Sequence, residues 1–219
     1  DDAQRMIGGL EALGISFAQV ESERGSGLRV TGRISRGGQL DLGNAGTATR
    51  FLTAAACLAP APVVIDGNAR MRQRPIGELT AMLGTLGAKI EFLGRPGFPP
   101  LRVHPGALKG RTLTIPSTQS SQFVSAIILI APHIEGGLTL VLERPITSAS
   151  YIEMTLQMMA RQGYEYSGSV GEGRLELWGS PLRQYSCDVE PDASSATYFW
   201  GAAGVVAGSR VEVKGLDGE

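Results

Sequence analysis

Hydrophobic residues at helical spacing occur in three stretches of the chain, and each stretch ends at a glycine. The apolar positions of 6–13, 76–86 and 152–159 recur every three or four residues, as in a helix with one buried face. The glycines that follow them are Gly14, Gly87 and Gly163. Glycine readily takes the left-handed backbone that closes a helix, so each stretch predicts a helix that ends there and continues into a strand.

A second set of elements follows each of these helices. Short alternating segments predict strands at 28–30, 101–103 and 175–177. More apolar helices then begin near Asn44, Ser117 and Asp192, and further strands are predicted at 63–65, 138–142 and 211–213. The pattern α-β-β-α-β recurs about every 75 residues. It is a circular permutation of a β-α-β-α-β-β unit.

This repetition predicts an α/β fold of repeated β-α-β-α-β-β units with pseudo-threefold packing. Units of this kind bury their helices in a shared core and leave the other face of each sheet exposed. Turn-forming residues at 179–181 predict that the chain begins to leave the first domain near there.

Charge and composition argue against a nucleic-acid-binding protein and against a membrane protein. The chain has 219 residues, with 20 Lys and Arg against 21 Asp and Glu, which argues against a nucleic-acid-binding surface. The longest apolar stretches, 51–62 and 123–132, are shorter than the ~20 residues of a membrane span and predict buried helices. The chain opens without the pattern of a secretory signal, so we expect a cytoplasmic protein with no membrane partner.

Cysteine and histidine give no sign of metal or redox chemistry. Cys57 and Cys187 lack any motif spacing, so we interpret both as free thiols that fill space. His104 and His133 stand alone near proline and glycine, which favours loop positions. We expect no metal site.

Three segments have the residue types of an anion site. Residues 42–50, LGNAGTATR, place glycines, a capping residue and a hydroxyl where an apolar helix begins, although an ordinary capped helix would look the same. Residues 117–122, STQSSQ, contain more hydroxyls and amides than one helix cap requires. Asp192 is acidic, and is better explained as a cap supported by the hydroxyls of Ser194 and Ser195.

Three arginines, Arg70, Arg72 and Arg74, precede a helix that Pro75 initiates. In an extended segment, alternate positions would place all three on one side. Guanidinium groups bind phosphates and carboxylates in bidentate fashion, which predicts an anion site. A solvated face paired with acidic neighbours such as Glu78 is the alternative.

Together these motifs resemble the 3-phosphoshikimate 1-carboxyvinyltransferase family, also called 5-enolpyruvylshikimate-3-phosphate synthase. The resemblance rests on LGNAGTA at 42–48, RPIG at 74–77, SSQF at 120–123 and DASSA at 192–196, in the family's order and at about its spacing. It implies a cofactor-free enzyme that transfers the enolpyruvyl group of phosphoenolpyruvate to shikimate 3-phosphate and releases phosphate.

The resemblance also implies roles for individual residues. Gly46 and Arg74 would hold phosphoenolpyruvate, with Asn44 in the same loop. Ser120 and Ser121 would bind the shikimate 3-phosphate. The remaining substrate-binding residues are Gln122, which would contact both substrates, and Ser148 and Tyr151, which would complete the shikimate 3-phosphate pocket. Ala149 and Ser150 stand where many members have Lys-Pro.

Family members are about twice as long as this chain. By resemblance, 1–188 is most of one domain without the first part of its first repeat, and 189–219 is the truncated start of a second domain. Segments with further substrate-binding residues and the acidic proton acceptor have no counterpart here. We therefore expect a monomeric parent enzyme and an inactive fragment without catalytic residues of its own.

Two alternatives remain from the sequence. The UDP-N-acetylglucosamine enolpyruvyl transferase family shares the fold but uses a cysteine on a mobile loop, whereas Cys57 lies in an apolar helix. A noncatalytic anion-binding or structural domain of the same fold is the other alternative.

Overall fold

The computed structural model describes residues 2–22, 25–117, 120–179 and 182–216. These residues form two compact units, one up to Arg183 and one from Gln184 onward. The predicted turn residues Ser180 and Pro181 lie outside the described residues.

The helices of the first unit match the predicted periodicity. They are α1 (Asp2–Ala12), α2 (Gly46–Ala56), α3 (Gly77–Thr85), α4 (Ser121–Ile130) and α5 (Ala149–Arg161), with 3₁₀ turns η1 (Met71–Gln73) and η2 (Ala131–His133). The glycines that follow α1, α3 and α5 have φ angles of 104° at Gly14, 103° at Gly87 and 81° at Gly163. The predicted left-handed helix ends are confirmed.

Within the described residues, ten strands form a hairpin and two four-stranded sheets. They are β1 (Ile15–Ser22), β2 (Gly25–Gly32), β3 (Gly38–Asp41), β4 (Val63–Asp66), β5 (Lys89–Phe92), β6 (Leu101–His104), β7 (Thr112–Ile115), β8 (Leu138–Leu142), β9 (Tyr166–Ser169) and β10 (Arg174–Leu177). The sheet orders are β3-β4-β6-β5 and β7-β8-β10-β9. In both, the first pair is parallel and the others are antiparallel.

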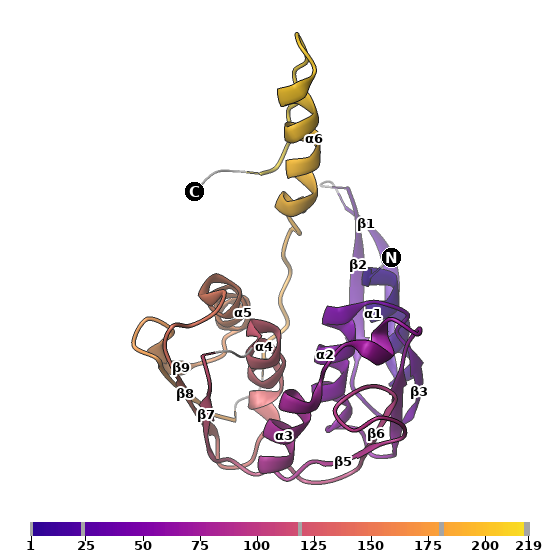
Figure 1. The fold of residues 1–219 in the computed structure, drawn as a ribbon, viewed down its shortest axis with the longest axis vertical. Helices are drawn as coiled ribbons and strands as arrows, with labels where there is room; N and C mark the ends of the chain where they lie inside the picture. The colour runs from indigo at the N-terminus through magenta and orange to yellow at the C-terminus, as the bar shows by residue number, and fades with distance from the viewer. Residues whose placement is uncertain (1, 23–24, 118–119, 180–181, 217–219) are drawn as a thin grey trace. The chain divides into compact units, whose positions relative to one another are not determined.

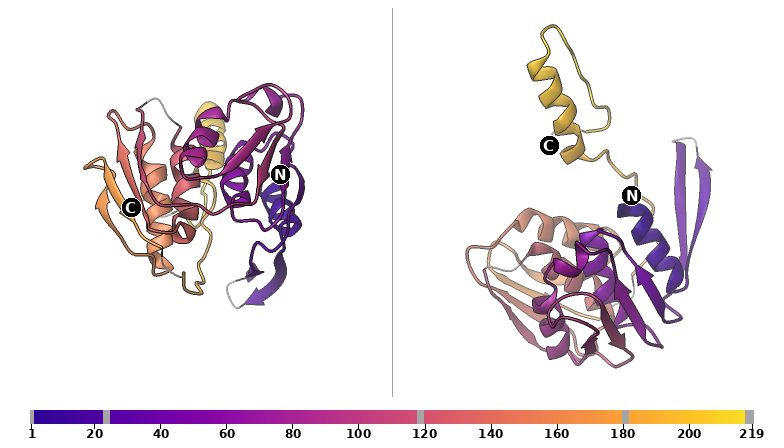
Figure 2. Two further views of the ribbon diagram at one scale, coloured as in Figure 1. Left: turned by 90° about the horizontal axis from the view of Figure 1, so that it is seen from below. Right: turned by 45° about the vertical axis from the view of Figure 1, so that its right-hand side comes forward.

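The two sheets belong to two copies of one unit, which we call the first repeat (38–104) and the second repeat (112–177). Each runs β-α-β-α-β-β, so the predicted permuted unit is confirmed. Figure 1 shows the sheets on opposite sides with the helices between them, and Figure 2 shows the same layers from below. Helix α4 packs against both α2 and α5.

One hydrophobic core joins the repeats. Leu52 of α2, Leu83 of α3 and Ile127 of α4 are almost fully buried within the same cluster. Along β4 and β8, buried and partly exposed residues alternate, because one face of each sheet covers the helices. The predicted helical core and outward sheet faces are therefore confirmed.

The β1–β2 hairpin differs from the two sheets. It pairs with no other strand among the described residues, and every residue of β2 is exposed. Leu28 and Val30 are more than half exposed. An isolated two-stranded ribbon has no second layer against which it can bury a face.

The part of the second unit that the structure describes contains one helix, α6 (Ala193–Val205). Asp192 caps it by accepting hydrogen bonds from the amides of Ser194 and Ser195, as predicted. The strand predicted at 211–213 is wrong, because these residues form no strand. The described part of this unit contains no strand with which 211–213 could pair, and an unpaired segment has no ladder of backbone hydrogen bonds.

Candidate functional site

Two loops meet at the carboxyl ends of the parallel strands β3 and β4. The amide of Leu42 donates to the Asp66 carbonyl at 2.9 Å, and the amide of Asn68 donates to the Gly43 carbonyl at 2.9 Å. Gly43 has φ 57°, which turns the chain toward α2. The loop before α2 and the loop after β4 are thereby held side by side.

Helix α2 begins without a side-chain cap. Its N-cap residue is Ala45, and no side chain accepts a hydrogen bond from its first amides. The capping role predicted within the 42–50 segment is therefore wrong. Asn44 is exposed and instead offers its backbone carbonyl to Nη1 of Arg74 at 3.2 Å. The uncapped amides carry partial positive charge, which favours an anion at this helix start.

Two guanidinium groups converge on Gly46, the first residue of α2. A Cβ atom at this buried glycine would lie 2.5 Å from Nη1 and from Nη2 of Arg74, and 2.7 Å from Nη1 of Arg50. Any side chain here would displace the arginines. Gly46 and Arg74, which the sequence assigned to one substrate, are therefore together in the structure, with Arg50 as an additional neighbour.

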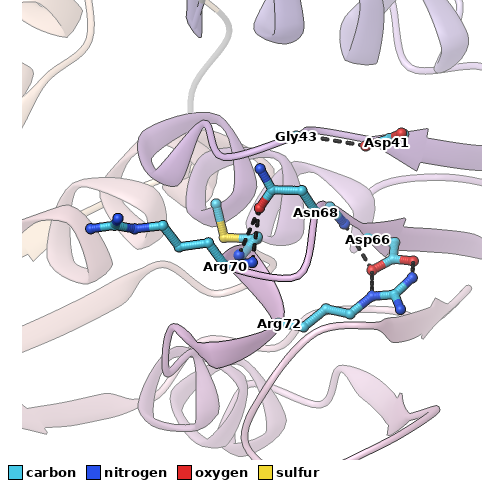
Figure 3. Close-up of polar contacts among 8 residues, drawn as sticks. Asp41, Gly43, Asp66, Asn68, Arg70 and Arg72 are labelled. Atoms are coloured by element: carbon cyan, nitrogen blue, oxygen red, sulfur yellow. Dashed lines mark hydrogen bonds and ion pairs between the residues drawn. The ribbon is translucent and has the colours of Figure 1, made fainter.

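The three arginines of 70–74 do not share one side, so this prediction is wrong. The segment contains the turn η1 and is not extended. Arg72 forms a bidentate ion pair with Asp66, with Nε–Oδ1 at 2.9 Å and Nη2–Oδ2 at 2.6 Å. This pair lowers the pKa of Asp66. Figure 3 shows Arg70 directed to the opposite side from Arg72, so only Arg74 reaches Gly46.

The serine loop of the second repeat starts α4. Ser120 is the N-cap, and its hydroxyl accepts from the amide of Gln122 at 3.4 Å. Ser121 is buried, and Ser120 and Gln122 are partly buried. Thr118 and Gln119, which belong to the predicted polar run, lie outside the described residues.

One hydrogen bond connects the two helix starts. Nε2 of Gln122 donates to Oγ1 of Thr47 at 3.2 Å, across 75 positions of the sequence. The ring of Phe123 also lies 5.4 Å from the guanidinium carbon of Arg50. The beginnings of α2 and α4 therefore lie side by side and form one polar region.

Ser148 and Tyr151 lie where β8 leads into α5. Ser148 has φ 52° and ψ 49°, the one left-handed non-glycine backbone among the described residues. Strained backbone of this kind is concentrated at functional sites. The hydroxyl of neighbouring Thr147 donates to the Ser117 carbonyl at 2.9 Å, which ties this loop to the serine loop. Tyr151 is 55% exposed.

A surface depression lies nearby but contains none of the predicted residues. Its lining includes Arg144, Ile146, Glu153 and Gly171. We do not assign it to the site, because the two uncapped or weakly capped helix starts and the convergent arginines lie elsewhere.

The main residue that the sequence analysis left without a role is Arg50. It stands four positions after Gly46, and this helical spacing places both residues on one face of α2. Burial lowers the pKa of the Arg50 guanidinium, and the positive charge of Arg74 lowers it further.

The cysteines and His104 form no part of this site. Cys57 is a free, buried thiol whose pKa burial raises to about 12, so it is a poor nucleophile. Cys187 is free and exposed. The loop position predicted for His104 is wrong, since it ends strand β6 with Nε2 3.4 Å from Oε2 of Glu91. Among the described residues, no group of His, Cys, Asp and Glu has the arrangement of a metal site, and no helix is long and apolar enough to cross a membrane.

Comparison with known proteins gives a consistent result. Residues 1–219 match the family described as EPSP synthase (3-phosphoshikimate 1-carboxyvinyltransferase). The 3-phosphoshikimate 1-carboxyvinyltransferase of Laribacter hongkongensis is 42% identical over 221 residues, covering 99% of this chain and 51% of that protein. The protein of the same name from Methanoculleus marisnigri is 38% identical over 219 residues, with the same coverage.

A solved structure supports the fold. The EPSP synthase of Acinetobacter baumannii superposes with a TM-score of 0.72 at 24% identity, covering 92% of this chain and 44% of that one. The chain thus spans about half the length of the relatives it matches. With the family match over all 219 residues, the chain belongs to the EPSP synthase (3-phosphoshikimate 1-carboxyvinyltransferase) family.

Proposed function

We propose that this chain is part of an enzyme that transfers the enolpyruvyl group of phosphoenolpyruvate to shikimate 3-phosphate and releases phosphate. The observation that carries the proposal is the Gln122–Thr47 hydrogen bond of 3.2 Å. It brings the glycine and arginine loop of the first repeat against the serine loop of the second repeat. Two adjacent anion-binding loops suit a reaction between two anionic substrates.

Each loop would hold one substrate. In the first repeat, Gly46 and Arg74 bind phosphoenolpyruvate beside Asn44, whose carbonyl orients Arg74. In the second repeat, Ser120 and Ser121 bind shikimate 3-phosphate, and Ser148 and Tyr151 complete its pocket. Gln122 stands between the loops and contacts both substrates.

This arrangement would supply orientation and charge stabilisation. In the reaction, the methylene carbon of phosphoenolpyruvate gains a proton while the 5-hydroxyl oxygen of shikimate 3-phosphate bonds to the adjacent carbon and loses its own proton. Loss of phosphate together with a methyl proton then restores the carbon–carbon double bond. Arginines and helix amides near the phosphate lower the cost of bringing two anions together.

The 219 residues would be inactive alone, because the acidic proton acceptor belongs to the rest of the parent enzyme. In this proposal, 1–188 is most of one domain and 189–219 begins the other. The parent is a cytoplasmic monomer that needs no metal or organic cofactor. The proposal therefore gives the isolated chain a noncatalytic, anion-binding role.

The test is calorimetric titration of the chain with shikimate 3-phosphate. We expect weak, saturable binding that is lost in Ser120→Ala/Ser121→Ala and retained in Arg74→Ala, because the serine loop holds this substrate. Ser26→Ala, at an exposed position of the hairpin, is the matched control and should bind like the wild type.

Two outcomes would contradict the proposal. If the wild type and the serine double variant bind equally well, shikimate 3-phosphate does not bind at the loop before α4. Turnover of both substrates by the purified chain would contradict the statement that the chain is inactive alone.

A further inference from the structure

Part of the Arg50 guanidinium is buried without the hydrogen-bond partners that such a group normally has. Its Nε and Nη1 atoms are inaccessible to solvent and make no hydrogen bond within the described residues. Buried donors of this kind are expensive to leave unpaired, and a buried charge is more so. The two unpaired N–H groups of Arg50 therefore indicate that a bound ligand supplies their hydrogen-bond acceptor.

The nearest charged neighbour makes the arrangement less favourable. Arg74 lies close enough that its charge lowers the pKa of Arg50, in addition to the effect of burial. Neither arginine forms an ion pair with an acidic residue in the described parts of the chain. Two positive charges thus stand together without compensation.

Both guanidinium groups are directed to the same point. Nη atoms of Arg50 and Arg74 lie within 2.7 Å of the position that a Cβ of Gly46 would occupy. The Phe123 ring, at 5.4 Å from the Arg50 guanidinium carbon, holds this cation from the side of α4 by cation–π attraction. The neighbouring helix thereby fixes the position of Arg50.

We propose that Arg50 is a second anion-binding arginine, which shares a phosphoryl group with Arg74 over Gly46. A phosphoryl dianion matches two uncompensated positive charges, and its tetrahedral oxygens can accept from two guanidinium groups that approach from different directions. A planar carboxylate carries one charge and binds less tightly. The proposal deepens the proposed function, since the phosphoryl group would belong to the substrate held by Gly46 and Arg74.

The test uses inorganic phosphate alone, so it does not depend on shikimate 3-phosphate binding or on turnover. The Nε–Hε NMR signals of the arginines are followed during titration of the 219-residue chain, with sodium acetate as the planar anion for comparison. We expect the Arg50 and Arg74 signals to follow one saturable curve for phosphate, with acetate at least tenfold weaker.

Three variants sharpen the test. Arg50→Gln should weaken phosphate binding at the Arg74 signal at least tenfold, and Arg50→Lys should weaken it about threefold to tenfold because an ammonium lacks the planar fork. Arg95→Gln is the matched control: Arg95 also lies over a phenyl ring, 4.0 Å from that of Phe98, but it is exposed and outside the site. This variant should stay within twofold of the wild type.

The proposal is overturned if the Arg50 signal does not move while that of Arg74 does, or if neither moves. It is also overturned if Arg50→Gln leaves the affinity within twofold. Failure of the proposed function is a separate result, because phosphate can bind the arginine pair even if the serine loop does not bind shikimate 3-phosphate.

Discussion

The two repeats have the same topology but different chemistry at corresponding places. Each has a parallel strand pair whose carboxyl ends lead into two helices, α2 and α3 in the first repeat and α4 and α5 in the second. The first helical residue is Gly46 in one repeat and Ser121 in the other. The fold therefore provides the same pair of helix starts twice.

The difference lies in what surrounds those helix starts. In the first repeat, a bare glycine leaves room for two arginines, and no side chain caps α2. In the second repeat, the hydroxyl of Ser120 caps α4, and among the described residues no arginine bonds to Ser120, Ser121 or Gln122, although Arg50 of α2 lies over the Phe123 ring. One start is strongly cationic, and the other is a neutral set of hydroxyls.

The repeated topology fixes the geometry of the helix starts, while individual residues select the ligand. Backbone amides at a helix start attract any anion. Guanidinium groups add charge, whereas hydroxyls can both donate and accept and so suit a sugar-like ring as well as a phosphate.

The largest expected effect concerns the shared core. Ile127 of α4 is fully buried in the core cluster that residues of both repeats share, so Ile127→Ala should lower the free energy of unfolding by about 2–5 kcal/mol. Hydrogen exchange at Val63 in β4 and Leu140 in β8 reports on each repeat separately. Both amides should lose protection together.

Leu129→Ala is the control, since this residue of the same helix is 39% exposed and its truncation should cost about 0.5 kcal/mol. Loss of protection at Leu140 without any change at Val63 would show that the repeats do not share one cooperative core.

The next effect separates the two helix starts. Gly46→Ala should weaken phosphate binding at the Arg74 NMR signal about tenfold, or about 1.4 kcal/mol, because the new methyl group displaces both guanidiniums. Ser121→Ala changes the corresponding position of α4 and should leave this affinity within twofold. Similar losses in both variants would mean that phosphate occupies a single site shared by both loops.

The sequence predicted the elements better than the directions of side chains. Periodic apolar residues and terminal glycines located α1, α3 and α5, because local spacing determines which face of a helix is buried. The strand at 211–213 failed because strand formation depends on a partner, which alternation alone does not supply.

The arginine segment failed for a local reason. The Asn68 side chain accepts from the amides of Arg70 and Met71, at 3.1 and 3.0 Å, and this turns the chain into η1 (Figure 3). Alternate residues then point to different sides. Asn68 is visible in the sequence, so its turn could have been predicted. The approach of Arg50 to Gly46 and Arg74 depends on packing between distant segments, which local patterns do not report.

A smaller effect compares the buried hydroxyls of the two repeats. Ser125 of α4 bonds to Thr155 of α5 at 2.8 Å, whereas Thr53 of α2 donates to the Thr49 carbonyl of its own helix at 2.7 Å. Ser125→Ala should cost about 1 kcal/mol, because a contact between two helices is lost. Thr53→Val should cost less than about 0.5 kcal/mol, because bonds back to the same helix add little. Urea denaturation measures both, and the reverse order would contradict this reasoning.

The smallest effect concerns the Arg72–Asp66 ion pair. Among the described ion pairs, the second repeat has no counterpart of it at the end of β8. The exposed Arg72–Asp66 pair joins η1 to the end of β4, and it lowers the pKa of Asp66. A carboxyl with a lowered pKa contributes stability above its ordinary pKa of about 3.9, and this contribution is lost as the pH falls through the lower, folded-state value. Arg72→Gln should therefore lower the Tm slightly at pH 6, by less than Ser125→Ala does, and the difference from wild type should vanish in stronger acid. A difference that grew on acidification would show that Arg72 acts through some group other than the Asp66 carboxylate.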